Sequence, residues 1–260
     1  MARLFVENDL SAGAEVPLKE AQAHYLRHVL RRPDGAPLLL FNGRHGEWRA
    51  SLAVRGKKAA SARIDARTRE QAAESDVWLC FAPIKRARID LVAEKATELG
   101  VSLLQPVLTR HTAVERVNIE RLRANAVEAA EQTERLSVPE VRAPVDLMRL
   151  LDGWPSERRL LMCDETGGGP PIAEVLSRLD EAARAAPWAI LIGPEGGFAA
   201  EELAALRRLK DVMSVGLGPR ILRADTAALA ALACWQALVG DWRRPTPRLN
   251  SDYRTSKVTV

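Results

Sequence analysis

The feature that most constrains this chain is an alternation of short apolar runs with helical patterns, which begins at Val77 and continues to Gly240. The run at residues 77–83 has the length of a buried strand, and residues 89–99 then place apolar side chains at helical spacing. The alternation returns several times, and residues 172–186 predict one of the later helices. Strands that alternate with helices are typical of βα units around a mainly parallel sheet. The sequence therefore predicts an α/β domain.

The N-terminal part of the chain follows a different pattern. Short apolar runs separated by turn signals, among them Asn42-Gly43, predict a small β-rich domain over residues 1–70. A helical stretch at residues 20–31 interrupts it, and a polar stretch typical of a linker follows it. We therefore expect the α/β domain at residues 77–242 and a polar tail at residues 243–260 that is mobile or ordered by a partner.

Composition narrows the classes of function. The chain has 260 residues, 47% of them hydrophobic, and a formal net charge of +4 with a pI near 9.2, which makes nucleic acid a plausible partner. Cys80, Cys163 and Cys234 sit singly in apolar stretches without metal-ligand spacing, so we expect reduced core residues and no metal site. The sequence shows neither a signal-peptide pattern nor an apolar run of roughly 20 residues, which predicts a cytoplasmic protein that does not enter a membrane.

Residues 190–198, with the sequence ILIGPEGGF, form the most informative segment. They predict a buried strand that enters a turn rich in Gly and Pro and then opens a helix. Glycines at such a turn allow a ligand to approach the backbone closely, although the same pattern also occurs as a purely structural connection. The segment lacks the GxxxxGK[ST] spacing of a phosphate loop and the GxGxxG dinucleotide pattern, and the carboxylate of Glu195 would repel phosphate.

A second turn of the same kind follows at residues 215–226, with the sequence VGLGPRILRADT. Two glycine turns at the carboxyl ends of successive strands line one crevice in a sheet of this kind. The apolar Leu217, Ile221 and Leu222 lie here beside polar side chains, and such a mixture suits an adenine-sized apolar slot.

The pair IGPEGGF and LGPRILRADT resembles the cofactor-binding signature of the RsmE family of SPOUT methyltransferases. Other stretches that resemble this family are RLFV at the N-terminus, HYLRHVLR at residues 24–31, KRARIDLVAEKATELGV at residues 85–101 and EAAEQTERLSVPEV at residues 128–141. These stretches occur in order and at sensible spacing, so the resemblance extends over both expected domains, up to Trp242.

The resemblance implies a fold and an activity that periodicity cannot show. The implied fold is a SPOUT-type α/β methyltransferase domain with a trefoil knot, preceded by a PUA-like β-barrel domain for RNA, although chains in general avoid knots. The implied activity is methylation of N3 of a uridine in 16S ribosomal RNA within the small ribosomal subunit, by a homodimer that uses S-adenosyl-L-methionine. The residues implied to bind this cofactor are Ile192, Gly193, Pro194, Glu195, Gly196, Gly197, Leu217, Gly218, Ile221, Leu222 and Thr226.

Two positions depart from the commonest pattern of the family. Asp225 stands where Glu is usual, which keeps a carboxylate but shortens it. Ala199 stands where a Ser or Thr often caps the following helix, a loss of about 1 kcal/mol that Glu201 and Glu202 near the helix start are expected to offset in part.

Methyl transfer to N3 of uracil requires that the N3 proton be removed, and negative charge then develops on the uracil oxygens. We expect Glu195 or Asp225 to accept the proton, and Arg220 or Arg223 to stabilise the charge. The edge of the base that carries N3 is paired or stacked in folded RNA, so the target nucleotide is expected to be unstacked or flipped out.

Basic side chains are candidates for contact with RNA, although a run of charges is most often a solvated face. Three cations at spacings of three and four share one face of the N-terminal helix, which fits a row of phosphates. Others follow an apolar strand at its carboxyl end or lie on the helix expected at residues 119–136, where surface ion pairs are the simpler interpretation. The candidates for RNA contact are Arg3, His24, Arg27, Arg31, Lys85, Arg86, Arg88 and Arg135.

Two other functions fit the same sequence. A SPOUT enzyme could modify another RNA base or a ribose 2′-OH with the same cofactor, and a non-catalytic RNA-binding assembly factor could keep the fold with a vestigial pocket. The intact glycines of both turns favour a working pocket over the second alternative. The identity of the methylated nucleoside would separate the enzymatic alternatives.

Overall fold

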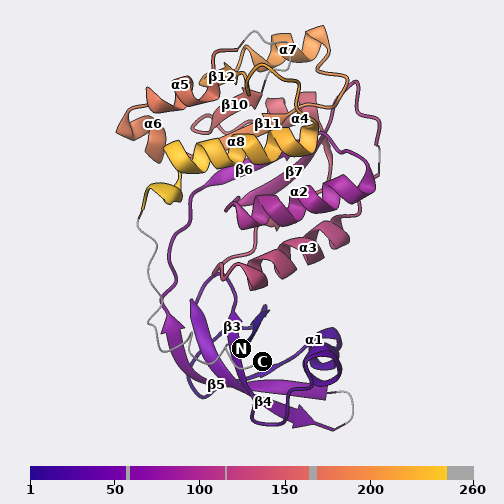
Figure 1. The fold of residues 1–260 in the computed structure, drawn as a ribbon, viewed down its shortest axis with the longest axis vertical. Helices are drawn as coiled ribbons and strands as arrows, with labels where there is room; N and C mark the ends of the chain where they lie inside the picture. Colours follow the sequence, from indigo (N-terminus) through magenta and orange to yellow (C-terminus); the bar gives the residue numbers. More distant parts are fainter. Residues whose placement is uncertain (57–58, 115, 164–168, 245–260) are drawn as a thin grey trace.

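The computed structural model describes residues 1–56, 59–114, 116–163 and 169–244, and it contains two sheets that share no strand (Figure 1). The first sheet has the strand order β1-β3-β4-β5-β2, in which β1 and β3 are parallel and the other pairs are antiparallel. Its strands are β1 (Ala2–Phe5), β2 (Glu15–Pro17), β3 (Pro37–Phe41), β4 (Glu47–Arg55) and β5 (Ala59–Arg69).

A short helix covers the apolar face of this first sheet. The predicted helix begins at the expected residue as α1 (Glu20–His24) and continues as a π-helix, η1 (Tyr25–Val29). Leu26 of this helix is fully buried with Leu38 and Leu52 of the sheet, so the apolar residues seen at helical spacing do form a core. The helix ends where Arg31 adopts a left-handed backbone with φ of 51°.

The second sheet has seven strands and only parallel pairs, which agrees with the predicted βα units. The strand order is β12-β10-β11-β6-β7-β8, and β9 also pairs with β7. Its strands are β6 (Val77–Phe81), β7 (Leu103–Leu108), β8 (Glu140–Val141), β9 (Val145–Asp146), β10 (Arg159–Cys163), β11 (Trp188–Ile192) and β12 (Val212–Val215).

Helices cover both faces of this sheet because successive strand side chains point to opposite sides. Leu79 and Phe81 belong to one buried cluster and Cys80 to the other. The helices on the first face are α2 (Arg86–Glu98), α3 (Ile119–Gln132), α5 (Ile172–Ser177), α6 (Glu181–Ala185) and α8 (Ala224–Leu238), followed by the 3₁₀ turn η2 (Asp241–Arg243). The other face is covered by α4 (Leu147–Asp152) and α7 (Ala200–Leu206). Within the described residues, no helix has the length and apolarity that a membrane crossing requires.

The helix predicted over residues 172–186 is wrong in its continuity, because the structure divides it into α5 and α6. Asp180 stands between the two helices, and its Oδ1 atom accepts a hydrogen bond of 2.7 Å from the N–H of Ala183. A side chain that accepts in this way starts a new helix, so Asp180 is an N-cap rather than an internal helical residue.

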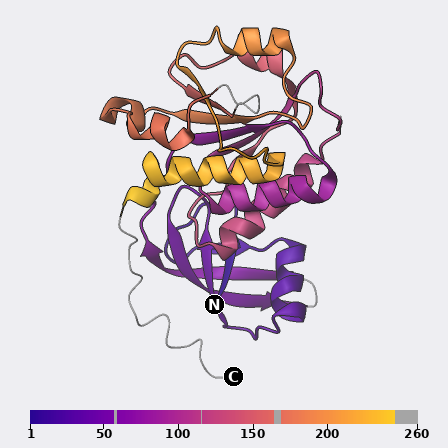
Figure 2. The same cartoon turned by 45° about the horizontal axis from the view of Figure 1, so that its top comes forward.

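The end of α3 joins the two parts of the protein. The N–H of Phe5 in β1 donates to the carboxylate of Glu131 at 2.8 Å, and the Arg69 guanidinium at the end of β5 donates to the backbone oxygen of Glu134 at 2.8 Å. Figure 2 shows α2, α3 and α8 between the second sheet and the β-rich domain. The β-rich domain therefore attaches to the helical layer and not to the sheet itself.

Candidate cofactor site

Two loops at the carboxyl edge of the second sheet enclose a pocket of about 450 Å³. One loop follows β11 and the other follows β12, and β10 lies between these two strands in the sheet. Ligands of open α/β sheets bind at this edge, and a pocket of roughly 300–1,000 Å³ suits a small molecule. The residues that line it are Cys163, Ile192, Gly193, Pro194, Glu195, Gly216, Leu217, Gly218, Pro219, Arg220, Ile221, Leu222, Arg223, Ala224 and Ala227.

Close packing explains why glycines occupy both loops. A Cβ atom on Gly193 would lie 2.8 Å from the ring of Phe198, and Gly218 has a φ of +101°, which side chains rarely permit. The loop after β12 also pairs in parallel with residues 170–172, which follow β10. There Gly216 donates its N–H to the backbone oxygen of Pro170 at 2.9 Å, and Ile172 donates its N–H to the oxygen of Gly216 at 3.1 Å. The backbone of the pocket is thus held by its own hydrogen bonds.

Most of the residues predicted to bind the cofactor line this pocket: Ile192, Gly193, Pro194, Glu195, Leu217, Gly218, Ile221 and Leu222. The other three predicted residues do not line it. The backbone oxygens of Gly196 and Gly197 each lie 3.1 Å from Nδ1 of His111, on the loop after β7. Thr226 is exposed, and its N–H donates to Asp225 at 2.9 Å.

Other lining residues were missed by the sequence interpretation. Ala227 lies four residues after Arg223, one helical turn away, so the helical spacing could have indicated it. Cys163 ends a different strand and carries no local signal. Burial raises the pKa of its thiol to about 12, so this side chain contributes a neutral, apolar wall. In the described ranges, no group of three or more His, Cys, Asp or Glu side chains could hold a metal ion.

The structure separates the candidate catalytic residues into two sets. Glu195, Arg220 and Arg223 line the pocket with exposed side chains. Asp225 does not line it, and its carboxylate, only 14% exposed, lies 3.5 Å from Nη1 of Arg88 in α2. Arg88, a candidate for RNA contact, thus holds the start of α8 against the start of α2.

The predictions that Arg3 and Arg135 contact RNA are wrong, because both guanidinium groups are buried where the two domains meet. Arg3 is 9% exposed, and its Nε atom donates to Glu47 at 2.7 Å while its Nη1 atom donates to the backbone oxygen of Ala130 at 2.9 Å. Arg135 lies beyond the end of α3 with a side chain that is 8% exposed, and it donates to the backbone oxygen of Thr97 at 2.6 Å. Cations that are buried and paired in this way cannot reach phosphate.

The other candidates for RNA contact lie on two separate surfaces. His24 is exposed on the helix of the β-rich domain and Arg31 is exposed just beyond its end, and Arg27 donates to the backbone oxygen of Gly56 at 3.0 Å. Figure 1 shows this helix, α1, at the opposite end of the molecule from β11 and β12. Lys85 is exposed at the start of α2, whereas the side chain of Arg86 lies outside the described residues, as does most of the predicted tail, residues 245–260.

Glu202, one of the two carboxylates expected to offset the missing helix cap at Ala199, makes two hydrogen bonds at the start of α7. One oxygen of this buried carboxylate accepts from the N–H of Ala199 at 2.8 Å, and the other accepts from the N–H of Arg110 at 2.8 Å. Glu201 is exposed. Glu202 therefore starts α7 and at the same time fastens the loop after β7 to it.

Comparisons with known proteins agree with this geometry. Residues 71–236 match the model of an RNA methyltransferase domain, and residues 18–65 match that of an RNA methyltransferase PUA domain. Ribosomal RNA small subunit methyltransferase E of Rickettsia conorii is 32% identical over 232 residues, which are 89% of this chain and 93% of that protein. The protein of the same name from Synechocystis is 32% identical over 240 residues, which cover 91% of this chain and 78% of the relative.

A solved structure gives the same result in three dimensions. The ribosomal RNA small subunit methyltransferase E of Neisseria gonorrhoeae, bound to S-adenosyl methionine, superposes with a TM-score of 0.83 at 30% identity and covers 93% of this chain and 99% of its own. These matches confirm the resemblance and the predicted fold class, an α/β domain of the SPOUT type with a parallel sheet that follows a PUA-like domain. The chain therefore belongs to the RNA methyltransferase family of ribosomal RNA small subunit methyltransferase E.

Proposed function

We propose that this protein transfers a methyl group from S-adenosyl-L-methionine to N3 of a uridine in the 16S RNA of the small ribosomal subunit. The observation that carries the proposal is the pocket of about 450 Å³ formed by the two glycine loops, with one carboxylate and two guanidinium groups in its lining. Family membership supports ribosomal RNA as the substrate, and the Neisseria relative binds this cofactor in a closely similar fold.

The residues of the pocket fit the proposed cofactor. The apolar side chains of Ile192, Leu217 and Leu222 offer a slot for an adenine ring, and the glycine backbone lets a ribose approach. The cofactor, when bound, supplies a methyl group on a sulfonium that an electron-rich nitrogen can accept. Because the acceptor nitrogen is itself the nucleophile in this transfer, the main contribution of the chain is to position the two reactants.

Three side chains of this chain have the chemistry to assist the acceptor base. Glu195 is the better candidate for accepting the N3 proton, since Asp225 is held by Arg88 outside the pocket. Arg220 and Arg223 are exposed at the pocket and can stabilise negative charge on the uracil oxygens. A uridine that reaches these groups must leave its stack, because N3 lies on the pairing edge of the base.

We assign recognition of the surrounding RNA to residues 1–70 and catalysis to residues 77–242. His24, Arg27 and Arg31 are candidates for phosphate contact on the first domain, and Lys85 on the second. In Figure 1, the helix α1 of this domain lies at the opposite end of the molecule from β11 and β12, whose loops form the pocket. A homodimer, in which one protomer holds the RNA and its partner holds the cofactor, would bring the two surfaces together.

Tritium transfer tests the function directly. Unmodified small subunits are incubated with labelled S-adenosyl-L-methionine and the protein, and the RNA is digested for mass spectrometry of its nucleosides. We expect N3-methyluridine. A methylated ribose or another methylated base would instead show a different specificity on the same fold, and binding of the cofactor without any transfer would favour an assembly factor.

A further inference from the structure

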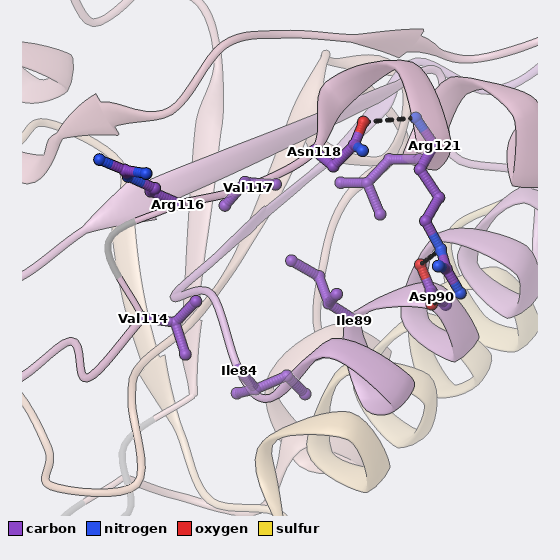
Figure 3. Close-up of a pocket in the computed structure, with 9 residues that line it drawn as sticks. Ile84, Ile89, Asp90, Val114, Arg116, Val117, Asn118 and Arg121 are labelled. Carbon is purple, nitrogen blue, oxygen red and sulfur yellow. Dashed lines mark hydrogen bonds and ion pairs between the residues drawn. The ribbon is translucent and has the colours of Figure 1, made fainter.

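A second pocket, of about 400 Å³, opens between the first turns of α2 and α3 (Figure 3). Its walls are mostly apolar, and polar side chains stand at its sides. The apolar residues are Ile84, Ile89, Val114, Val117 and Leu122, and the polar ones are Asp90, Arg116, Asn118 and Arg121. None of these residues lines the first pocket.

The polar groups of this second pocket are unequal in what they can offer a ligand. Asp90 lies 2.6 Å from Nη2 of Arg121, so the charges of this pair are matched, and Oδ1 of Asn118 accepts from the N–H of Arg121 at 3.0 Å. Arg116 is exposed, and in the described part of the chain no residue forms an ion pair with it. Figure 3 shows Arg116 on one side of the pocket and the Asp90–Arg121 pair on the other. The pocket therefore combines an apolar floor with one available cation.

The two pockets are neighbours on the same edge of the sheet. The first lies at the carboxyl ends of β10, β11 and β12, and the second lies beyond the ends of β6 and β7, which follow β11 in the strand order. The ion pair between Arg88 and Asp225 joins the starts of α2 and α8, one residue from the lining residues Ile89 and Ala224. A strand of RNA that presents one base to the cofactor in the first pocket has the second pocket beside it.

The loop after β7 links the two pockets mechanically. This loop carries Val114 and Arg116 into the second pocket. Its His111 donates from Nδ1 to the backbone oxygens of Gly196 and Gly197, which directly follow Glu195 of the first pocket. Since both acceptors are carbonyl oxygens, Nδ1 must carry the hydrogen. A ligand that fixes the conformation of this loop would therefore also fix, through His111, the turn that carries Glu195.

We propose that the second pocket binds a nucleotide of the RNA strand adjacent to the methylated one, with its base on the apolar floor and its phosphate on Arg116. The proposal rests on the proposed function and adds a subsite for the substrate. An apolar surface accepts the face of any base, and a free guanidinium pairs with phosphate, so the site recognises a nucleotide without reading its sequence.

Two variants and a matched control test the subsite. Arg116→Ala removes the phosphate contact, Val114→Trp fills the pocket without a change of charge, and Arg123→Ala removes a half-exposed cation of α3 that does not line the pocket. In steady-state methylation of small subunits, we expect the KM of the first two to rise about tenfold with kcat nearly unchanged, and the KM of the control to stay within about twofold. Calorimetry should show unchanged affinity for S-adenosyl-L-methionine in all three.

A cross-link provides a readout that does not need activity. A short oligouridylate that contains 4-thiouridine is irradiated with the wild-type protein, and the adduct is mapped by mass spectrometry; we expect it within residues 109–122, and expect Val114→Trp to lose it. KM values of both pocket variants equal to that of the control, or adducts only elsewhere, would overturn the proposal. A change of oligomeric state in Val114→Trp by light scattering would also overturn it, because a second protomer would then occupy the pocket. Failure of the wild type to methylate, with the cross-link in place, would reject the proposed function but not the subsite.

Discussion

Replacement of Arg3 by Met tests the conclusion that this arginine joins the domains and does not bind RNA. Arg3 is 9% exposed; its guanidinium donates to Glu47 at 2.7 Å and to the backbone oxygen of Ala130 at 2.9 Å, and it stacks 3.8 Å from the centre of the Phe41 ring. Its loss leaves the Glu47 carboxylate, whose side chain is 7% exposed, with Arg69 at 3.8 Å as its nearest cation. Removal of one partner from a buried ion pair costs about 3–5 kcal/mol.

Equilibrium unfolding in urea measures this cost, with circular dichroism and tryptophan fluorescence as two probes. We expect Arg3→Met to lower the free energy of unfolding by about 3–4 kcal/mol, and Arg49→Met, on an exposed position of β4, to change it by less than about 0.5 kcal/mol. The double replacement of Arg3 by Met and Glu47 by Leu should recover part of the loss, since it leaves no unpaired charge. If Arg3→Met is as stable as Arg49→Met and only methylation of subunits falls, Arg3 contacts RNA and our assignment is refuted.

Three further predictions concern the cofactor pocket and its supports. Ala227→Phe should weaken binding of S-adenosyl-L-methionine about 10- to 100-fold in calorimetry by filling the pocket, whereas Thr226→Phe on the exposed side of α8 should not; equal affinities would contradict the pocket assignment. Glu202→Ala leaves two backbone N–H groups without their acceptor and should lower the free energy of unfolding by about 2–3 kcal/mol, against less than about 0.5 kcal/mol for the exposed Glu201→Ala. Burial, partly opposed by the N–H of Phe5 and by Arg3, raises the pKa of Glu131 from 4.5 to about 6, so the folded state binds this proton more tightly than the unfolded state does. Stability from this group is therefore fully present below pH 4.5 and is lost as the pH rises through about 6, and Glu131→Gln should become more stable relative to the wild type by about 1 kcal/mol between pH 4.5 and 7, after allowance for solvent screening. A pH-independent difference in unfolding would disprove this account of Glu131.

Local patterns of sequence were sufficient for most of the longer strands and helices and for the loops of the cofactor pocket. After Val77, the spacing of apolar residues indicates whether a segment is a strand or a helix and which of its faces is buried. This spacing involves only residues that are close together in the chain. Both glycine loops could be located because glycine is required wherever another group leaves no space for a Cβ atom, as at Gly193, or wherever φ is positive, as at Gly218. The apolar pattern over residues 172–186 predicted one helix although two are present, because the pattern does not show that the side chain of Asp180 accepts a hydrogen bond and starts a second helix.

Only the tertiary structure decided which charged side chains are available to a ligand. Arg3 and Arg135 look like surface cations in the sequence, but the backbone oxygens that bury them, those of Ala130 and Thr97, are more than 30 positions away along the chain, and no local pattern reports such partners. The same holds for Asp225, which Arg88 holds outside the pocket, and for the second pocket, whose walls come from α2, α3 and the loop after β7. Burial of a charge depends on what the whole fold brings to it, because desolvation is favourable only where distant groups supply the compensating hydrogen bonds.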